Sequence, residues 1–192
     1  NELATHISGV LRGILRKNGV EDAWVTDAAA GVGGDTIALA GVFRHVNSVE
    51  LDAHRFRMLR NNLEVAVPGA ERSGRVVLYN DDALQRVPQL QHDAVYLDAP
   101  WGGEQYAREG DGVSLAVGSV DVADFAVNYT GNARWVAMKV PRNYRFDDLW
   151  RNASFAESMV QVHYEEVGSN YFGKPKFLFC VFERLVVGKI YY

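Results

Sequence analysis

Two hydrophobic patterns alternate along the chain. In one, apolar residues recur every three or four positions, which is typical of an amphipathic helix. In the other, short runs rich in β-branched and aromatic residues indicate buried strands. Helices are predicted over residues 1–18, 35–43, 53–67, 120–130 and 144–154. Strands are predicted over residues 22–27, 46–52, 75–82, 92–100, 133–143, 159–167 and 175–187.

The order of these elements predicts an α/β fold. Strands that alternate with helices pair in parallel, and the connecting helices cover both faces of the sheet. The last two strands follow each other around a turn at 168–174, so they form an antiparallel hairpin at the end of a mostly parallel, seven-stranded sheet. We predict a single domain, residues 1–192, in which an N-terminal helix (1–18) precedes a core (19–192).

Composition changes this picture mainly by excluding classes of protein. A chain of 192 residues, 48% of them hydrophobic, is long enough for one sizeable core. The net charge of -4 argues against a non-specific binder of long nucleic acids, which usually presents a basic surface. The lone Cys180 provides neither a disulfide framework nor a thiolate metal site. Because no membrane span or signal peptide is visible, we expect an intracellular protein (nuclear or cytoplasmic) with no metal and no evident protein partner.

Polar residues end five of the predicted strands. They are Asp27, Glu50, Asp82, Asp98 and the tripeptide Pro141-Arg142-Asn143. Parallel sheets bind ligands at the carboxyl ends of their strands, near the switch in strand order. One such residue is weak evidence for a site, because Asp and Gly are common at the ends of strands, where they favour turns. Five together predict a binding site at this edge of the sheet.

A glycine-rich loop follows the first strand. Gly31 and Gly33 let the backbone approach a ligand closely, although a tight strand-to-helix turn would need the same glycines. A dinucleotide-binding loop would have a third glycine where this chain has Thr36, which we count among the candidate cofactor-binding residues. Asp27 lies just before the loop, where it would repel a pyrophosphate but suits an ammonium group such as that of an amino acid.

Two further strand ends suggest which other chemical groups the ligand contains. Glu50 ends the second strand, where a carboxylate commonly pairs with ribose hydroxyls. Asp82 ends the third strand and can accept a hydrogen bond from an adenine amino group. A helix cap is the alternative role for Asp82, and Asp81 competes for both roles. A ligand with an amino acid, a ribose and an adenine is S-adenosylmethionine, which we predict as the cofactor.

The stretch Asp98-Ala99-Pro100-Trp101 leaves the fourth strand beside the methyl group of the predicted cofactor, so Asp98 also counts among the candidate cofactor-binding residues. The Asp98 carboxylate and the Ala99 carbonyl, held by Pro100, are acceptors that can orient the hydrogens of an exocyclic amine. The nitrogen lone pair then points at the methyl group for in-line attack. Trp101 offers a flat face for base stacking, worth ~1–3 kcal/mol. A core tryptophan at a turn is the alternative for Trp101.

These motifs resemble those of the RNA cap guanine-N2 methyltransferases, the trimethylguanosine synthase family. The resemblance rests on "DAAAGVGGDTIALA", "VNSVELDAHRFRMLRNNLEV", "YNDDAL", "AVYLDAPWGGEQY" and "AMKVPRN", and it covers nearly the whole chain. It implies the Rossmann-like fold of class I S-adenosylmethionine-dependent methyltransferases and a 7-methylguanosine cap as substrate, whose positive charge suits a tryptophan face. It further implies that Tyr106, Arg142 and Asn143 contact the cap. The family's usual fourth-strand motif is Ser-Pro-Pro-Trp, whereas this chain has Asp-Ala-Pro-Trp.

Three functions stay open on the sequence. The first is methyl transfer to N2 of the cap guanine, giving a di- or trimethylguanosine cap, with capped RNA or a cap nucleotide as partner. The second is methylation of N2 of guanine or N6 of adenine at internal bases of ribosomal RNA or DNA, which Asp98 favours. The third is a non-catalytic module that binds cap or cofactor. Since the chain begins at Asn1 and not at Met, we expect a preceding segment, which in the resembled family helps to form the sites.

Overall fold

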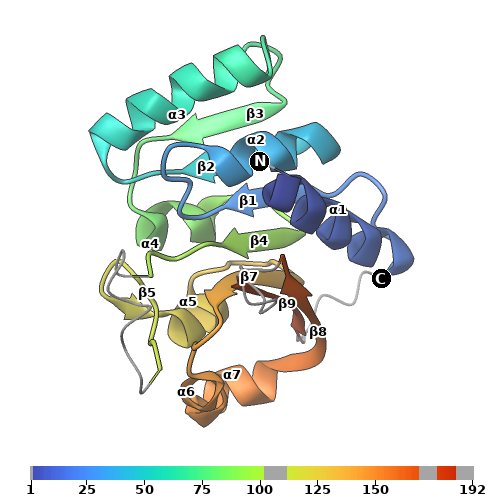
Figure 1. Ribbon diagram of the computed structural model, residues 1–192, viewed down its shortest axis with the longest axis vertical. Coiled ribbons are helices and arrows are strands. Elements are labelled where there is room, and N and C mark those ends of the chain that lie inside the picture. The colour runs from blue at the N-terminus through green and yellow to red at the C-terminus, as the bar shows by residue number, and fades with distance from the viewer. Residues whose placement is uncertain (1, 102–111, 169–176, 185–192) are drawn as a thin grey trace.

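A seven-stranded sheet forms the centre of the fold (Figure 1). The computed structural model describes residues 2–101, 112–168 and 177–184. Strands β3, β2, β1, β4 and β7 lie in this order and run parallel, and β9 and β8 follow as an antiparallel pair. The strands are β1 (Trp24–Asp27), β2 (His45–Val49), β3 (Val76–Tyr79), β4 (Ala94–Leu97), β7 (Trp135–Pro141), β8 (Met159–Val167) and β9 (Phe177–Arg184). The predicted fold class is thereby confirmed, including the C-terminal hairpin.

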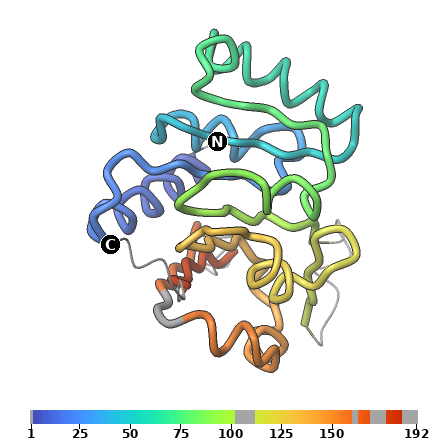
Figure 2. Tube along the Cα trace, turned by 180° about the vertical axis from the view of Figure 1, so that it is seen from behind, coloured from blue at the N-terminus to red at the C-terminus, as the bar shows by residue number. Residues whose placement is uncertain are grey.

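Helices cover both faces of this sheet (Figures 1 and 2). They are α1 (Glu2–Lys17), α2 (Gly34–Val42), α3 (Ala53–Ala66), α4 (Ala83–Arg86), the 3-10 turn η1 (Val87–Gln89), α5 (Val122–Asn128), α6 (Phe146–Arg151) and α7 (Ala153–Ser158). On one face, Leu11 of α1 and Leu39 of α2 belong to a single apolar layer with the sheet. On the other, Phe125 of α5 and Phe155 of α7 form the second layer. None of the described helices has the length and apolar character needed to cross a membrane.

One predicted helix, over residues 144–154, is divided in the structure. The prediction of a single helix there is wrong, because Asn152 adopts an extended conformation between α6 and α7. Its side chain accepts a hydrogen bond from the Phe155 N–H at 3.0 Å and so caps α7. The short α4 and the small sheet of β5 (Ala116–Val117) and β6 (Val120–Asp121) were not predicted, because elements of two to four residues show no periodicity.

The turn from β1 into α2 depends on Gly33. Its φ is 95°, in the left-handed region that residues with a side chain avoid. A Cβ at this position would lie 2.7 Å from Leu59 Cδ1 of α3. The glycine therefore allows the loop after β1 to pass close against α3.

Gly33→Ala should lower the free energy of unfolding by about 1–3 kcal/mol, because it adds backbone strain and an overlap with Leu59. Gly41→Ala is the matched control, since Gly41 lies near the end of α2 with open space around a Cβ. That change should stabilise the protein by about 0.5–1 kcal/mol. Urea unfolding of both variants measures the difference, and equal stabilities would contradict the role of Gly33.

Candidate functional site

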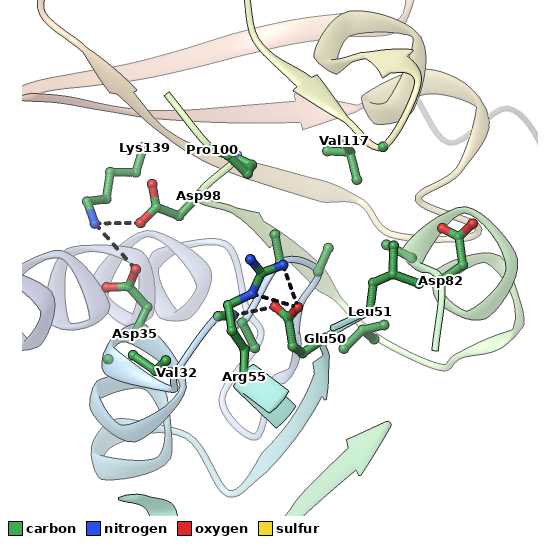
Figure 3. A pocket seen from close by; sticks show the side chains of 18 of the residues that line it. Val32, Asp35, Glu50, Leu51, Arg55, Asp82, Asp98, Pro100, Val117 and Lys139 are labelled. Carbon is green, nitrogen blue, oxygen red and sulfur yellow. Dashed lines mark hydrogen bonds and ion pairs between the residues drawn. The ribbon is translucent and has the colours of Figure 1, made fainter. Parts of the chain in front are cut away.

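A pocket of about 710 Å³ lies at the carboxyl ends of the parallel strands (Figure 3). Its lining follows the sheet order, with Asp82 after β3, Glu50 after β2, residues 28–31 after β1, Asp98 after β4 and Lys139 on β7. Asp82 thus lies at one end of the pocket, Asp98 and Lys139 lie at the other, and Glu50 lies between them. The predicted site residues in this lining are Gly31, Glu50, Asp82, Asp98 and Pro100.

The other predicted site residues lie outside the lining. They are Asp27, Gly33, Thr36, Asp81, Ala99, Trp101, Arg142 and Asn143. Arg142 is exposed directly after β7, and the Asn143 carbonyl accepts from the Val113 N–H at 2.9 Å. Tyr106 lies outside the described residues. Of the predicted cofactor-binding residues, the structure therefore brings only Gly31, Glu50, Asp82 and Asp98 to one pocket. The cap contacts predicted for Arg142 and Asn143 stay predictions.

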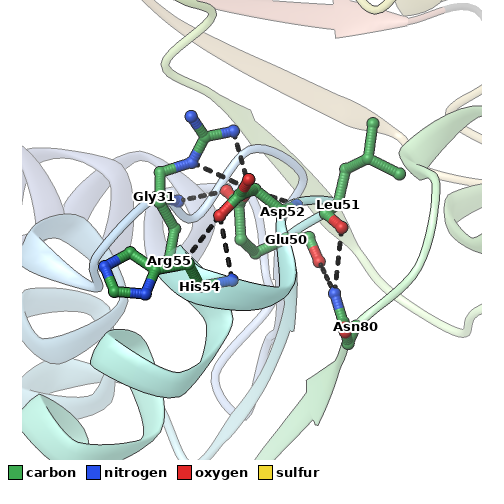
Figure 4. Close-up of polar contacts among 7 residues, drawn as sticks. All are labelled: Gly31, Glu50, Leu51, Asp52, His54, Arg55 and Asn80. Atoms are coloured by element: carbon green, nitrogen blue, oxygen red, sulfur yellow. Dashed lines mark hydrogen bonds and ion pairs between the residues drawn. The ribbon is translucent and has the colours of Figure 1, made fainter.

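Glu50 is held in place by hydrogen bonds to both of its oxygens (Figure 4). Its Oε2 accepts from the Gly31 N–H at 2.8 Å. Its Oε1 accepts from the Asp52 N–H at 2.8 Å and from Arg55 Nε at 3.0 Å. Gly31 reaches Glu50 with a φ of 56°, a conformation that suits glycine. The glycine-rich loop after β1 and the end of β2 are thereby fixed to each other.

Asp27 ends β1 and is buried. Thr36 Oγ1 donates to Asp27 Oδ2 at 2.6 Å and lies 2.7 Å from Ser48 Oγ. Within the described chain, Asp27 Oδ1 has no hydrogen-bond partner. The pKa of Asp27 is raised to about 7, first by burial and then by the charge of Asp35, while the hydrogen bond from Thr36 opposes the rise. Thr36 thus occupies the third-glycine position as a buried partner of Asp27.

The free energy of unfolding of Asp27→Asn should fall less with rising pH than that of the wild-type protein. A carboxyl whose pKa is raised from 3.8 to about 7 on folding binds its proton more tightly in the folded chain. Its contribution to the free energy of unfolding is therefore greatest at low pH and is lost as the pH rises through about 7. At pH ~8 the variant should be the more stable protein, by up to about 4 kcal/mol.

Urea unfolding at pH ~5 and pH ~8 measures this effect, since the two values lie on either side of the raised pKa. Part of the pH dependence should survive in the variant, because the pKa of Asp98 is also raised to about 7. Equal pH dependence of the variant and the wild type would contradict the raised pKa of Asp27.

The two acids after β3 have different partners. Asp82 Oδ1 accepts from the Leu84 N–H at 2.9 Å, which caps α4. Asp81 forms an ion pair with Arg86, whose Nη2 lies 2.7 Å from Asp81 Oδ2, and this hydrogen-bonded partner lowers the pKa of Asp81. The helix-cap role of Asp82 is confirmed, and of the two acids it is Asp82 that borders the pocket.

Asp98 shares a lysine with a second carboxylate. Lys139 Nζ lies 2.6 Å from Asp98 Oδ2 and 3.4 Å from Asp35 Oδ2 (Figure 3). Burial raises the pKa of Asp98 to about 7, and the ammonium of Lys139 opposes this rise. The acid of the fourth-strand motif is therefore a paired carboxylate in the pocket wall, able to accept a hydrogen bond from an amine.

Trp101 is half-buried and packs against both apolar layers. The centroid of the Trp101 ring lies 6.5 Å from that of Phe177 on β9. Lys139 Nζ lies 5.9 Å from the Trp101 centroid. This packing agrees with the alternative role of a core tryptophan at a turn, and the predicted stacking role stays a prediction.

Negative charge dominates the described lining of the pocket. Its charged residues are Asp35, Glu50, Asp82, Asp98, Arg55 and Lys139. Both cations are already paired with carboxylates of the same lining. Such a surface opposes the pyrophosphate of a dinucleotide and favours a cationic ligand. In the described part of the chain, no group of three or more His, Cys, Asp or Glu side chains is placed to hold a metal ion.

Comparison with known protein families identifies the family of this chain. The profile of the RNA cap guanine-N2 methyltransferases matches residues 23–185, a range that includes every strand of the main sheet. The chain belongs to this family. The resemblance seen in the sequence is thereby confirmed.

A curated protein resembles this chain over part of its length. "Uncharacterized protein L320" of Acanthamoeba polyphaga mimivirus is 31% identical over 127 residues, which are 64% of this chain and 48% of that protein. The chain thus spans about half the length of this curated relative.

Solved structures share the fold of this family member. The methyltransferase domain of bacterial CtHen1-C has a TM-score of 0.63 at 14% identity, covering 94% of this chain and 98% of that one. A putative RNA methyltransferase from Pyrococcus horikoshii gives 0.58 at 16% identity, with 94% and 84% covered. M. jannaschii TYW2, solved in complex with AdoMet, gives 0.54 at 15% identity, with 86% and 70% covered. At these identities the likeness establishes the methyltransferase fold alone.

Three charged residues in the pocket of this family member were not predicted from the sequence. They are Asp35, Arg55 and Lys139. Asp35 and Arg55 lie near the starts of helices, where charged residues are common. Lys139 did carry a signal, because it is the charged residue in the apolar run at 135–141, and a charge inside a buried strand requires a partner.

Proposed function

We propose that this chain transfers the methyl group of S-adenosylmethionine to the exocyclic N2 of the 7-methylguanosine cap of RNA. The proposal rests on the position of Asp98 and Pro100 in the lining of a pocket whose other strand ends carry Glu50 and Asp82. Cofactor-side carboxylates and the methyl-acceptor motif thereby border one cavity of about 710 Å³. Membership of the RNA cap guanine-N2 methyltransferase family supports the cap guanine as the target.

The lining of the pocket fits S-adenosylmethionine. Glu50 Oε2 accepts from the Gly31 N–H and has a second lone pair for a ribose hydroxyl. Val32 (42% exposed) and Leu51 (63% exposed) offer apolar surface to an adenine, and Asp82 can accept from its amino group. When bound, this cofactor supplies an electrophilic methyl group on a cationic sulfonium. The excess of carboxylates in the lining favours that charge.

The residues after β4 would orient the methyl acceptor. The Asp98 carboxylate and the Ala99 carbonyl would accept the two hydrogens of guanine N2, so that the nitrogen lone pair faces the methyl donor. Pro100 restricts the backbone that carries these acceptors. Trp101, packed beside Phe177, would stack on the base, and its π face would favour the cationic 7-methylguanine over guanine by ~0.5–2 kcal/mol.

Methyl transfer from labelled S-adenosylmethionine to 7-methylguanosine triphosphate tests the proposal, with GTP as the control. We expect transfer to the methylated nucleotide alone. Calorimetric titration with the cofactor, run in parallel, separates two kinds of failure. Cofactor binding with no transfer to either nucleotide would contradict the cap guanine as substrate, and absence of cofactor binding would contradict the assigned cofactor site.

A second candidate function is methylation of an internal base of ribosomal RNA or DNA. Asp98 favours it, because Asp is common at this position in the amine methyltransferases of those substrates, whereas the cap family usually has Ser. Transfer to an uncapped RNA or DNA fragment, with none to 7-methylguanosine triphosphate, is its expected result. A non-catalytic binding module would bind the cofactor and transfer methyl groups to none of these substrates.

A further inference from the structure

Lys139 lies on β7 beside the carboxyl end of β4. β7 is otherwise apolar between Trp135 and Pro141, and its other residues are buried. Leu97 of β4 pairs with Met138 of β7, so Asp98 and Lys139 follow next to each other on neighbouring strands. The Lys139 side chain is only 17% exposed and borders the pocket. Its placement is therefore a consequence of strand register and not of a flexible surface loop.

Contacts from three directions hold the Lys139 ammonium. Asp98 Oδ2 lies 2.6 Å from Nζ on the β4 side, and Asp35 Oδ2 lies 3.4 Å away in the first turn of α2. Aromatic faces complete the surroundings, with the centroids of Phe177 and Trp101 at 5.3 Å and 5.9 Å from Nζ. Both ring distances are within the range of a cation–π contact. The ammonium is thus fixed between the acid of the acceptor motif and the start of α2.

A purely stabilising role explains this arrangement poorly. A buried ion pair often contributes no more to stability than well-packed apolar residues of the same volume. The pair also borders the pocket instead of the apolar core. Because the lysine engages Oδ2 of Asp98, it limits the orientations open to a carboxylate that borders the pocket.

We propose that Lys139 is a positioning residue for the methyl-acceptor site, which favours the ionised form of the Asp98 carboxylate and limits its orientation while Asp35 anchors the ammonium from α2. This inference rests on the proposed function, because it assigns the amine of that reaction as the donor to Asp98. It explains why an acid replaces the serine of the usual family motif here, since the acid has a lysine on the neighbouring strand.

The charges around Asp98 support this role. The groups that act on it from the described elements are Asp27 of β1, Asp35 of α2, Tyr96 of β4 and Lys139 of β7. Burial and Asp35 raise the pKa of the Asp98 carboxyl, and the lysine is the group that lowers it. Burial lowers the pKa of Lys139, but the two carboxylates outweigh this effect and leave it raised, so the ammonium stays charged. Removal of Lys139 would therefore leave Asp98 protonated over a wider range of pH.

Lys139→Met tests the proposal, with Lys139→Arg as the charge-conserving variant and Lys17→Met, an exposed residue at the end of α1, as the control. The ¹³C resonance of the Asp98 carboxyl, assigned with Asp98→Asn, is followed over pH in each protein. Lys139→Met should raise its apparent pKa by about 1–3 units. The same variant should lower kcat by about 10- to 100-fold, with the cofactor KM changed far less.

Lys139→Arg should recover most of the rate and the wild-type titration, whereas Lys17→Met should change neither. An Asp98 titration that is identical in Lys139→Met and wild type would overturn the inference, as would equal loss of rate in the Met and Arg variants. These outcomes differ from failure of the proposed function, which would appear as absence of methyl transfer by the wild-type protein. The carboxyl titration needs no turnover and decides the electrostatic role of Lys139 in either case.

Discussion

Asp98→Asn should lower the rate of methyl transfer by about 100- to 1,000-fold. Asparagine fills the same space and retains a carbonyl acceptor, but it carries no charge. Hydrogen bonds to an ionised acceptor are roughly twice as strong as neutral ones, so the amine of the substrate would be held less firmly in the geometry for attack. The fold should survive, because Lys139 keeps Asp35 as a partner at 3.4 Å.

Single-turnover kinetics with 7-methylguanosine triphosphate measure this loss. Asp22→Asn is the matched control, since Asp22 is exposed and precedes β1 at the end of the sheet opposite to the pocket. Cofactor affinity of Asp98→Asn should fall far less than the rate does, because Glu50 and Asp82 remain in the other parts of the pocket. Wild-type rates in Asp98→Asn would contradict its assigned role as acceptor.

Glu50→Ala should weaken cofactor binding by about 10- to 100-fold and also lower the free energy of unfolding by about 1–3 kcal/mol. The first effect follows from loss of the carboxylate assigned to the ribose. The second follows because the N–H groups of Gly31 and Asp52 lose their common acceptor in a part of the pocket where Glu50 is only 5% exposed. Calorimetric titration and urea unfolding measure the two effects separately.

Glu50→Gln gives the sharper test of this arrangement. Both carboxylate oxygens accept hydrogen bonds, so an amide must direct its NH₂ group toward either the Gly31 N–H or the Asp52 N–H. The glutamine variant should therefore lose stability almost as alanine does. Glu157→Ala, an exposed change on α7, should leave stability and cofactor binding near wild type. A fully stable Glu50→Gln protein would refute the double-acceptor role.

The strand ends could be predicted because the patterns that determine them are local. Buried strands require apolar runs, and parallel pairing places their carboxyl ends at one edge of the sheet. Of the five strand ends assigned to that edge, Glu50, Asp82 and Asp98 line one pocket in the structure, whereas Asp27 and residues 141–143 lie outside its lining. The division of the predicted helix at Asn152 was not predictable in the same way, since apolar spacing continues across the break.

The sequence by itself determined the α/β order, the position of the glycine-rich loop and the acids at the strand ends, because each depends on residues close together in the chain. Only the tertiary structure decided which charges meet. Lys139 lies 41 positions from Asp98 and 104 from Asp35. These pairings depend on strand register and on how α2 packs against the sheet, which are set by the core as a whole.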